Sequence, residues 1–240
     1  LEDSVEVRSA IDDAIAKIDR KLILIDYLGR LFSGLSLGSI LLLAAMGLAI
    51  TYGLLGVINL AHGEMLMIGA YATYVTQQLF TSFLPNFFDL YILAAIPMAF
   101  LSAAAIGVLL ERTVIRWLYG RPLETLLATW GISLFLIQSV RQIFGAQNVE
   151  VSNPNWLSGG VELWNVVMPF NRIAISIFAV FVLGGIWLVI SQTRLGLFIR
   201  SVTQNRSMAS CVGVNTAKID MLAFGLGSGI AGLAGVALSQ

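Results

Sequence analysis

The sequence contains one cysteine and one histidine among its 240 residues, so it has few of the side chains that metal sites and nucleophilic sites require. A lone cysteine excludes a disulfide framework and any multi-cysteine metal site. His62-Gly63-Glu64 has the H-x-E spacing of a zinc deaminase, but that site also needs a P-C-x-x-C partner, whereas Cys211 stands alone. We therefore expect neither a metal site nor a Cys–His nucleophile.

Charged residues are also scarce. They make up 12% of the chain, while 58% of its residues are hydrophobic; soluble domains have about 25% charged residues. This much apolar surface cannot be hidden inside one soluble core of this size, which indicates an integral membrane protein. The 14 basic and 14 acidic residues balance. Because nucleic-acid binding needs a clustered basic surface, we do not expect a nucleic-acid partner.

A phosphate-binding loop is absent from the sequence. The motif G-x-x-x-x-G-K-[ST] needs a lysine after a glycine, and none of the three lysines follows one. Residues 227–232 match G-x-G-x-x-G, but they lie in an apolar stretch with no strand before it, so we expect no dinucleotide site. Gly225, Gly229 and Gly232 instead share one helix face and are predicted to serve helix packing. We expect a protein that is not an enzyme.

The first 30 residues differ from the rest, because they hold 12 of the 28 charged residues. Isoleucines and leucines recur at steps of three and four, which predicts an amphipathic helix. This helix is interpreted as a solvated lead-in that packs on the membrane domain or a neighbour. A lipid-binding helix is the alternative, but acidic residues outnumber basic ones seven to five there. The apolar positions are Ile11, Ile15, Ile18, Leu22 and Ile25.

The chain starts at Leu1 rather than at a methionine and stops directly after an apolar run. We therefore interpret residues 1–30 as the end of a longer polar region. Residues 31–240 are interpreted as a membrane domain that is truncated at its C-terminus.

Long stretches without charge predict an all-α, polytopic membrane bundle with about six segments, since about 20 apolar residues span a bilayer. Residues 31–63 are too many for one span and too few for two, so a glycine-rich break through Gly53 and Gly56 is expected after the first span. The predicted segments cover residues 31–51, 65–88, 90–110, 125–140 with an extension at its start, 173–192 and 221–239.

Lysine and arginine set the expected orientation, because they are enriched in cytoplasmic loops. Residues 111–122 and 194–220 contain most basic residues of the hydrophobic part, whereas the long loop 141–172 contains only Arg141 and Arg172. We place the first two segments inside the cell and the loop outside. Counting back places the N-terminal helix outside, although the basic residues next to the first span favour the other side.

The break after the first span carries polar side chains. Asn59, His62 and Glu64 lie within six residues of one another. Polar groups at membrane depth are costly and usually face a cavity or a partner. These three residues are predicted to line or gate a polar path; an ordinary polar helix end at the interface is the alternative.

The segment that follows the fifth span is predicted to contain a short helix over residues 198–213. Gly213 is expected to end this helix, and Phe198, Val202 and Met208 give it an apolar side. Its composition leaves two alternatives open. The helix lies on the bilayer, or it docks on a soluble partner.

This segment, from Gly196 to Thr216, resembles the cytoplasmic coupling segment of ABC-importer permeases of the branched-chain amino acid class. The stretches Thr203–Arg206 and Met208–Cys211 are most similar to the urea-transporter branch. Gly34–Ser39, Thr51–Glu64 and Glu111-Arg112 with Gly120-Arg121-Pro122 also resemble that family. The resemblance covers residues 31–240, and the leading segment is similar to the tail of an extra N-terminal region in some urea-type members.

The resemblance implies a permease subunit in a bacterial inner membrane that imports urea or a related small amide. It also implies four kinds of partner: membrane lipid, a second permease, two ATPase subunits that bind ATP, and a soluble substrate-binding protein. Branched-chain amino acid import by the same fold, or a passive channel for a small solute, is the alternative. Residues implied in coupling to the ATPase are Phe198, Arg200, Val202, Gln204, Asn205, Arg206, Met208 and Gly213.

Overall fold

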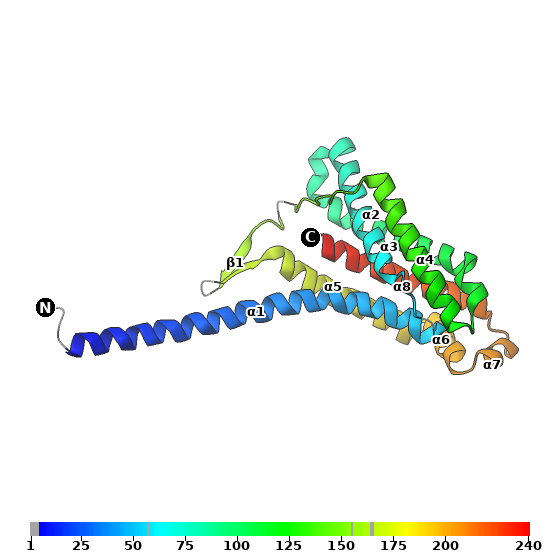
Figure 1. The fold of residues 1–240 in the computed structure, drawn as a ribbon, viewed down its shortest axis with the longest axis horizontal. Coiled ribbons are helices and arrows are strands. Elements are labelled where there is room, and N and C mark those ends of the chain that lie inside the picture. Colours follow the sequence, from blue (N-terminus) through cyan, green and yellow to red (C-terminus); the bar gives the residue numbers. More distant parts are fainter. Residues whose placement is uncertain (1–4, 57, 155, 164–165) are drawn as a thin grey trace.

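The computed structural model describes residues 5–56, 58–154, 156–163 and 166–240, and it is almost entirely helical. Figure 1 shows a bundle from which one long helix projects. The elements in order are α1 (Val5–Leu55), α2 (His62–Phe83), the 3-10 turn η1 (Pro85–Leu90), α3 (Tyr91–Thr113), the 3-10 turn η2 (Ile115–Leu118), α4 (Pro122–Phe144), β1 (Gly160–Leu163), β2 (Val166–Pro169), α5 (Phe170–Gln192), α6 (Arg194–Gln204), α7 (Arg206–Cys211) and α8 (Thr216–Ser239). The strands pair antiparallel, with Gly160 opposite Pro169.

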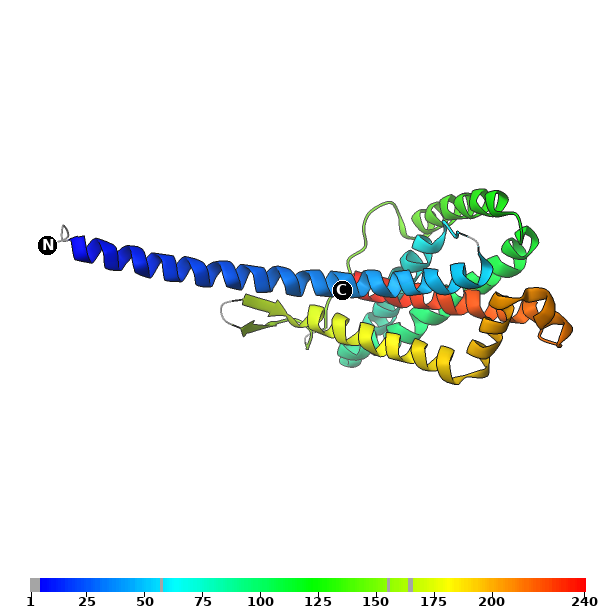
Figure 2. The same cartoon turned by 90° about the horizontal axis from the view of Figure 1, so that it is seen from below.

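Helix α1 joins two parts that the sequence pattern separates. The amphipathic lead and the first span form one continuous helix of 51 residues, and no proline interrupts it. Figure 2 shows its N-terminal half extending beyond the bundle. Ile18 there is 58% exposed, while Leu43 in the bundle is fully buried. The helix therefore runs across residue 30 without a break, and the division of the chain into two regions at that residue stays a prediction.

Among the residues that the structure describes, five helices are long and apolar enough to cross a membrane, against the six segments that the sequence predicts. The spans are Ala14–Gly53, Pro85–Thr113, Pro122–Phe144, Phe170–Gln192 and Thr216–Ser239. Helix α2 is not among them, although its 22 residues reach about 33 Å at 1.5 Å per residue. Its buried face includes Thr73, Thr76 and Gln77, which lower its hydropathy. It still runs antiparallel to α3 inside the bundle (Figure 1).

Helix α8 lies at the centre of the bundle and packs against α1, α2 and α3. Nearly every residue from Ala223 to Ala237 is buried. Such burial on all sides requires small side chains at the points of closest approach. The three glycines singled out in the sequence all face α3: a Cβ would lie 2.8 Å from Val108 at Gly225, 2.5 Å from Phe100 at Gly229 and 2.6 Å from Ala103 at Gly232.

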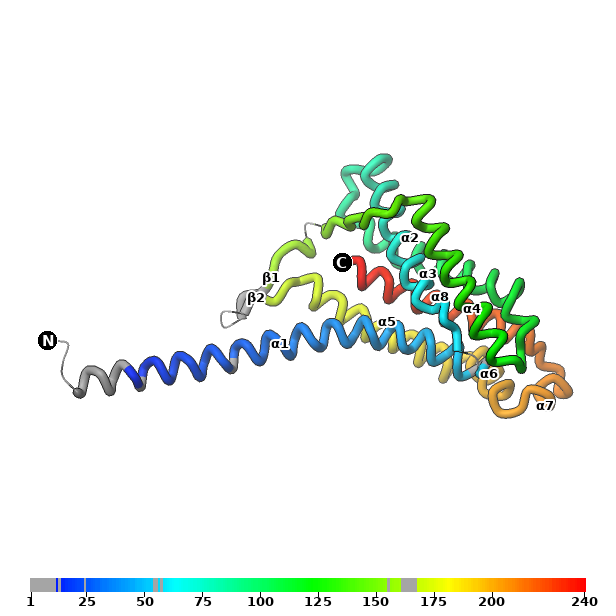
Figure 3. Tube along the Cα trace, viewed as in Figure 1, coloured from blue at the N-terminus to red at the C-terminus, as the bar shows by residue number. Residues whose placement is uncertain are grey.

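The two ends of the bundle differ in charge. The segments 111–122 and 194–220 meet at one end, which we call the basic end (Figure 3). The loop between α4 and α5 lies at the opposite end with the hairpin and η1 (Figure 1). The fold therefore groups these segments as the arginine pattern predicts, and the N-terminal half of α1 projects beyond the opposite end (Figure 2). Which end faces the cytoplasm stays a prediction.

Replacing a glycine at a backbone contact of α8 is expected to destabilise the bundle. A Cβ at Gly235 would lie 2.0 Å from the carbonyl oxygen of Leu66, so Gly235→Ala should cost about 1–3 kcal/mol through overpacking and lower the thermal unfolding midpoint in detergent. Gly229→Leu should act in the same direction through Phe100. Gly184→Ala in α5 is the control, because nothing lies within 4 Å of its Cβ position. Equal midpoints for Gly235→Ala and Gly184→Ala would contradict the packing argument.

Sidedness is open to labelling with a membrane-impermeant maleimide. In a Cys211→Ser background, Arg116→Cys at the basic end should react only after the inner membrane is permeabilised, whereas Asn153→Cys at the opposite end should react in spheroplasts. Both positions are exposed. The background protein without added cysteine is the control, and the reverse pattern would invert the orientation.

Candidate functional site

The polar break lies where α1 ends and α2 begins. Gly56 has a φ of +62°, which glycine adopts without strain, and its N–H donates to the carbonyl of Tyr52 over 2.8 Å. The side chain of Asn59 then accepts a hydrogen bond from the backbone N–H of Ala61 at 3.1 Å. This local turn reverses the chain, so that α2 starts at His62.

The structure brings Asn59, His62 and Glu64 together with neighbouring helices. Asn59 and His62 are buried, at 5% and 8% exposure. The Nε2 atom of His62 lies 2.9 Å from the carbonyl oxygen of Ala44 in α1. The Oε1 atom of Glu64 accepts a hydrogen bond of 2.5 Å from the hydroxyl of Ser133 in α4. The break is therefore a junction of α1, α2 and α4.

Each of these three side chains also presents one buried polar atom without a hydrogen-bond partner. These atoms are Nδ2 of Asn59, Nδ1 of His62 and Oε2 of Glu64. Buried polar atoms normally have a partner, and an exception needs an explanation. These three atoms leave hydrogen-bonding capacity at the break for a water or another polar molecule.

A row of hydroxyl groups on α4, which is not among the residues predicted from the sequence, faces the same break. Thr125, Thr129 and Ser133 are 0%, 1% and 9% exposed, on a helix whose other face is open. Thr129 accepts a hydrogen bond from the backbone N–H of Leu60 at 3.2 Å. The signal was present in the sequence, since hydroxyl residues at i, i+4 and i+8 share one helix face. We call Asn59, His62, Glu64, Thr129 and Ser133 the polar junction.

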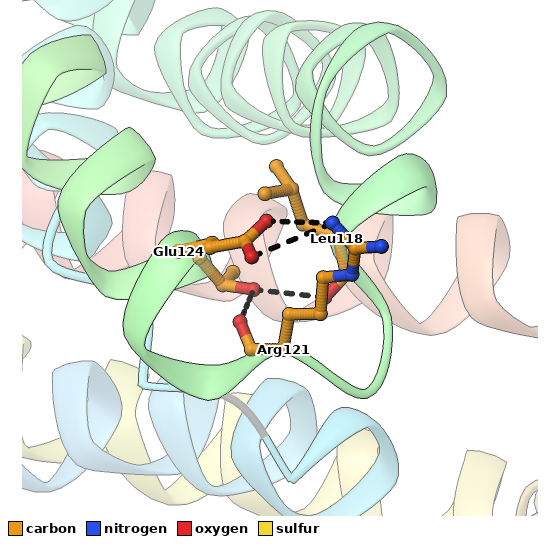
Figure 4. Close-up of polar contacts among 4 residues, drawn as sticks. Leu118, Arg121 and Glu124 are labelled. Carbon is orange, nitrogen blue, oxygen red and sulfur yellow. Dashed lines mark hydrogen bonds and ion pairs between the residues drawn. The ribbon is translucent and has the colours of Figure 1, made fainter.

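The start of α4 is fixed to the loop before it (Figure 4). The hydroxyl of Thr125 donates to the carbonyl oxygens of Leu118 and Arg121, at 3.1 and 2.9 Å. Arg121 forms an exposed ion pair of 3.1 Å with Glu124 in the first turn of the helix. Exposed pairs of this kind add little stability, so the buried threonine is the main anchor.

The segment at the basic end forms two short helices rather than the single helix predicted over 198–213. Helix α6 ends at Gln204 and α7 begins at Arg206. Asn205 between them has extended backbone angles, and its side chain accepts a hydrogen bond of 3.0 Å from the N–H of Met208. Asparagine at this position caps α7, which makes a break more favourable than a continuous helix.

Gly213 ends α7 as predicted. Its φ of +92° suits glycine. The N–H of Val214 donates to the carbonyl of Ala209 at 3.0 Å, and the N–H of Gly213 donates to that of Ser210 at 3.1 Å. These two bonds form the Schellman motif that commonly terminates helices.

The three predicted apolar anchors differ in their surroundings. Val202 is 4% exposed and packs with Ala209 and Ile219, and the partly buried Phe198 packs against this cluster. Met208 is 60% exposed, and Val212 is 78% exposed. A partner can therefore reach Met208 and Val212, whereas Val202 belongs to the chain's own core.

Arg200 and Arg206, which the family resemblance implies in coupling to the ATPase, both bind groups of this chain. Arg200 donates to the carbonyls of Gly196 and Ile190, each at 3.3 Å. Both terminal nitrogens of Arg206 donate to the carboxylate of Asp220 in α8. Gln204 is exposed at the end of α6.

Arg206 and Asp220 belong to a larger cluster with Tyr119 and Glu111, which we call the basic-end cluster. The guanidinium carbon of Arg206 lies 4.8 Å from the ring centroid of Tyr119. The Tyr119 hydroxyl donates to Oε1 of Glu111 at 3.2 Å. Burial, and the carboxylates of Asp220 and Glu111 nearby, raise the pKa of Tyr119, so it stays a neutral donor.

No group of three or more histidine, cysteine or acidic residues is placed to hold a metal ion within the described part of the chain.

Comparison with known proteins gives a consistent result. Residues 30–240 match the family described as "Branched-chain amino acid transport system / permease component". The high-affinity branched-chain amino acid transport system permease protein BraD of Pseudomonas aeruginosa is 32% identical over 220 residues, which are 89% of this chain and 71% of BraD. The corresponding protein LivH of Escherichia coli K12 is 30% identical over 218 residues, with the same two shares. No solved structure matches the chain.

Proposed function

Because the chain belongs to the permease family of branched-chain amino acid transport systems, we propose that it is a membrane-spanning subunit of an ATP-driven importer. The match over residues 30–240 carries this proposal. The chain is a multi-pass membrane protein whose described residues include five apolar spans, and proteins of this family transport rather than catalyse. ATP would be bound by separate subunits, in keeping with the missing phosphate-binding loop.

The cargo we propose is a branched-chain amino acid. BraD and LivH are both described as permeases for this class, and neither description mentions urea. The polar junction supports the same choice, since the unpaired Oε2 of Glu64 suits a cationic ammonium group better than neutral urea. Urea is the second candidate, and it depends on the residues Thr203–Cys211, which resemble the urea branch.

The polar junction is proposed to line or gate the path. A cargo with an ammonium and a carboxylate group can exchange hydrogen bonds with the unpaired atoms of Asn59, His62 and Glu64 as it passes. The hydroxyl protons of Thr129 and Ser133 are donated to the carbonyl of Leu126 and to Glu64, so these two residues offer the cargo acceptor lone pairs. The junction is built on the ends of α1 and α2, and a small displacement of α4 would separate Ser133 from Glu64.

The partners follow from this assignment. A second permease subunit, two ATPase subunits and a soluble binding protein would complete the importer. We propose that the ATPase docks at α7, because Met208 and Val212 are exposed there and helices commonly dock through a few spaced apolar residues. The rival is that α7 lies on the bilayer.

Removing the carboxylate at the junction is expected to slow transport without loss of the complex. Glu64→Ala removes both the bond to Ser133 and the unpaired acceptor, so uptake should fall about tenfold, as expected for one charged hydrogen bond. Uptake of radiolabelled cargo per purified complex measures this. Glu150→Ala is the control, because Glu150 is exposed at the opposite end. Unchanged uptake for Glu64→Ala would favour the alternative that these residues form an ordinary polar helix end.

Uptake by the reconstituted importer tests the function and the cargo together. We expect ATP-dependent accumulation of labelled leucine in proteoliposomes, and none when the ATPase lacks its phosphate-loop lysine. Urea accumulation without leucine accumulation would transfer the assignment to the second candidate. Equilibration of either solute without ATP would show a passive channel instead.

A further inference from the structure

The basic-end cluster contains two carboxylates that are almost inaccessible to solvent. Asp220 is 0% and Glu111 is 1% exposed, and neither takes part in the polar junction. A buried charge is tolerated when it is paired and hydrogen-bonded. Asp220 meets this condition because both terminal nitrogens of Arg206 donate to its carboxylate. Arg206 lies in the short helix α7 and not in a spanning helix.

The pair of Arg206 and Asp220 connects a short helix at the basic end to the central helix of the bundle. Arg206 is the first residue of α7, whereas Asp220 lies in the first turns of α8, the central helix. Tyr119, beneath the guanidinium group, belongs to the connection between α3 and α4. The cluster therefore links the segment where the ATPase is proposed to dock with α8, with α3 and with the connection that leads into α4.

The side chains of Arg206 and Asp220 differ in solvent exposure, so separating them would have unequal costs for the two residues. The side chain of Arg206 is 42% exposed, while that of Asp220 is fully buried. If α7 moved alone, Arg206 could find other partners, but Asp220 would remain as an uncompensated buried charge, which is strongly unfavourable. Motion of α7 together with α8 avoids this cost.

Helix α8 in turn contacts the helices that form the junction. A Cβ at Gly227 would lie 2.6 Å from Thr51 in α1, and a Cβ at Gly235 would lie 2.0 Å from Leu66 in α2. At such distances backbones cannot slide independently. A displacement of α8 would therefore act on α1 and α2 next to the break.

We propose that Arg206 and Asp220 are positioning residues that form an internal strut, with Tyr119 and Glu111 as its support, and that this strut transmits movement of α7 to α8 and the polar junction. The proposal rests on the importer function proposed above. It assigns Arg206 to this chain's own transmission path rather than to the surface that binds the ATPase.

The test uses the complete importer in nanodiscs and measures cargo transported per ATP hydrolysed. Asp220→Asn keeps the size of the side chain and removes its charge. The ATPase should copurify in the normal ratio and hydrolyse ATP, but cargo per ATP should fall about tenfold, within the roughly 5- to 150-fold range of coupling between sites. Arg206→Gln should give the same loss. Arg206→Lys should be intermediate, because it keeps the charge and loses the two-pronged geometry.

Two variants serve as references. Lys218→Gln changes an exposed charge in the first turn of α8 and should leave the ratio of cargo to ATP unchanged. Met208→Asp places a charge on the proposed docking surface and should reduce copurification of the ATPase. The strut variants should differ from both.

Several results would overturn the strut. Cargo per ATP equal to that of the unmodified importer in Asp220→Asn would do so. So would a lower yield of complex with a normal ratio, which indicates a merely structural role. If the ATPase failed to copurify with Arg206→Gln but copurified with Asp220→Asn, Arg206 would belong to the surface that binds the ATPase. If the Asp220→Asn protein does not accumulate in cells, the test uses Arg206→Lys instead. Cargo transported per ATP equal to that of the unmodified importer in Arg206→Lys would then overturn the strut. Absence of ATP-dependent uptake by the unmodified importer would instead refute the proposed function.

Discussion

Around α8, helices approach so closely that glycine lies at the points of contact with α1, α2 and α3. In a membrane, where lipid is as apolar as any side chain, close packing of this kind supplies much of the attraction between helices. It also fixes their relative positions, because an added methyl group at Gly235 would meet backbone rather than a movable side chain. This packing also fixes the geometry of the polar junction, because α1 contacts α8 just before the break and α2 contacts α8 just after it.

Local patterns in the sequence predicted the features that depend on local physics. The helical class, most spans, the break near Gly56 and the helix end at Gly213 follow from hydropathy, from charge and from the conformational freedom of glycine. The face shared by Gly225, Gly229 and Gly232 also follows from helical period, and it lies against α3.

Features that depend on distant partners were missed. The pattern of residues 198–213 did not reveal the break at Asn205, which arises because a capping side chain competes with helix continuation. Arg206 was assigned to a partner protein because Asp220, 14 positions away, is brought beside it only by the turn at Gly213. Similarly, the sequence alone does not show that Ser133 of α4 contacts Glu64, because the two residues are brought together only by the fold. Helix α2 is too polar to count as an apolar span, which leaves five such spans in the described part of the chain; a helix surrounded by protein need not be apolar.

The continuity of α1 has a mechanical consequence. Residues 5–31 form a rod about 40 Å long, at 1.5 Å per residue, and the same helix continues into the bundle without a proline or other break before Leu55. Without a hinge, a tilt of α1 within the bundle is carried to the far tip. A tilt of about 10° would swing that tip by about 7 Å, given the helical rise. Because α1 is one uninterrupted helix, any rotation of its part within the bundle would produce a larger displacement at its projecting end.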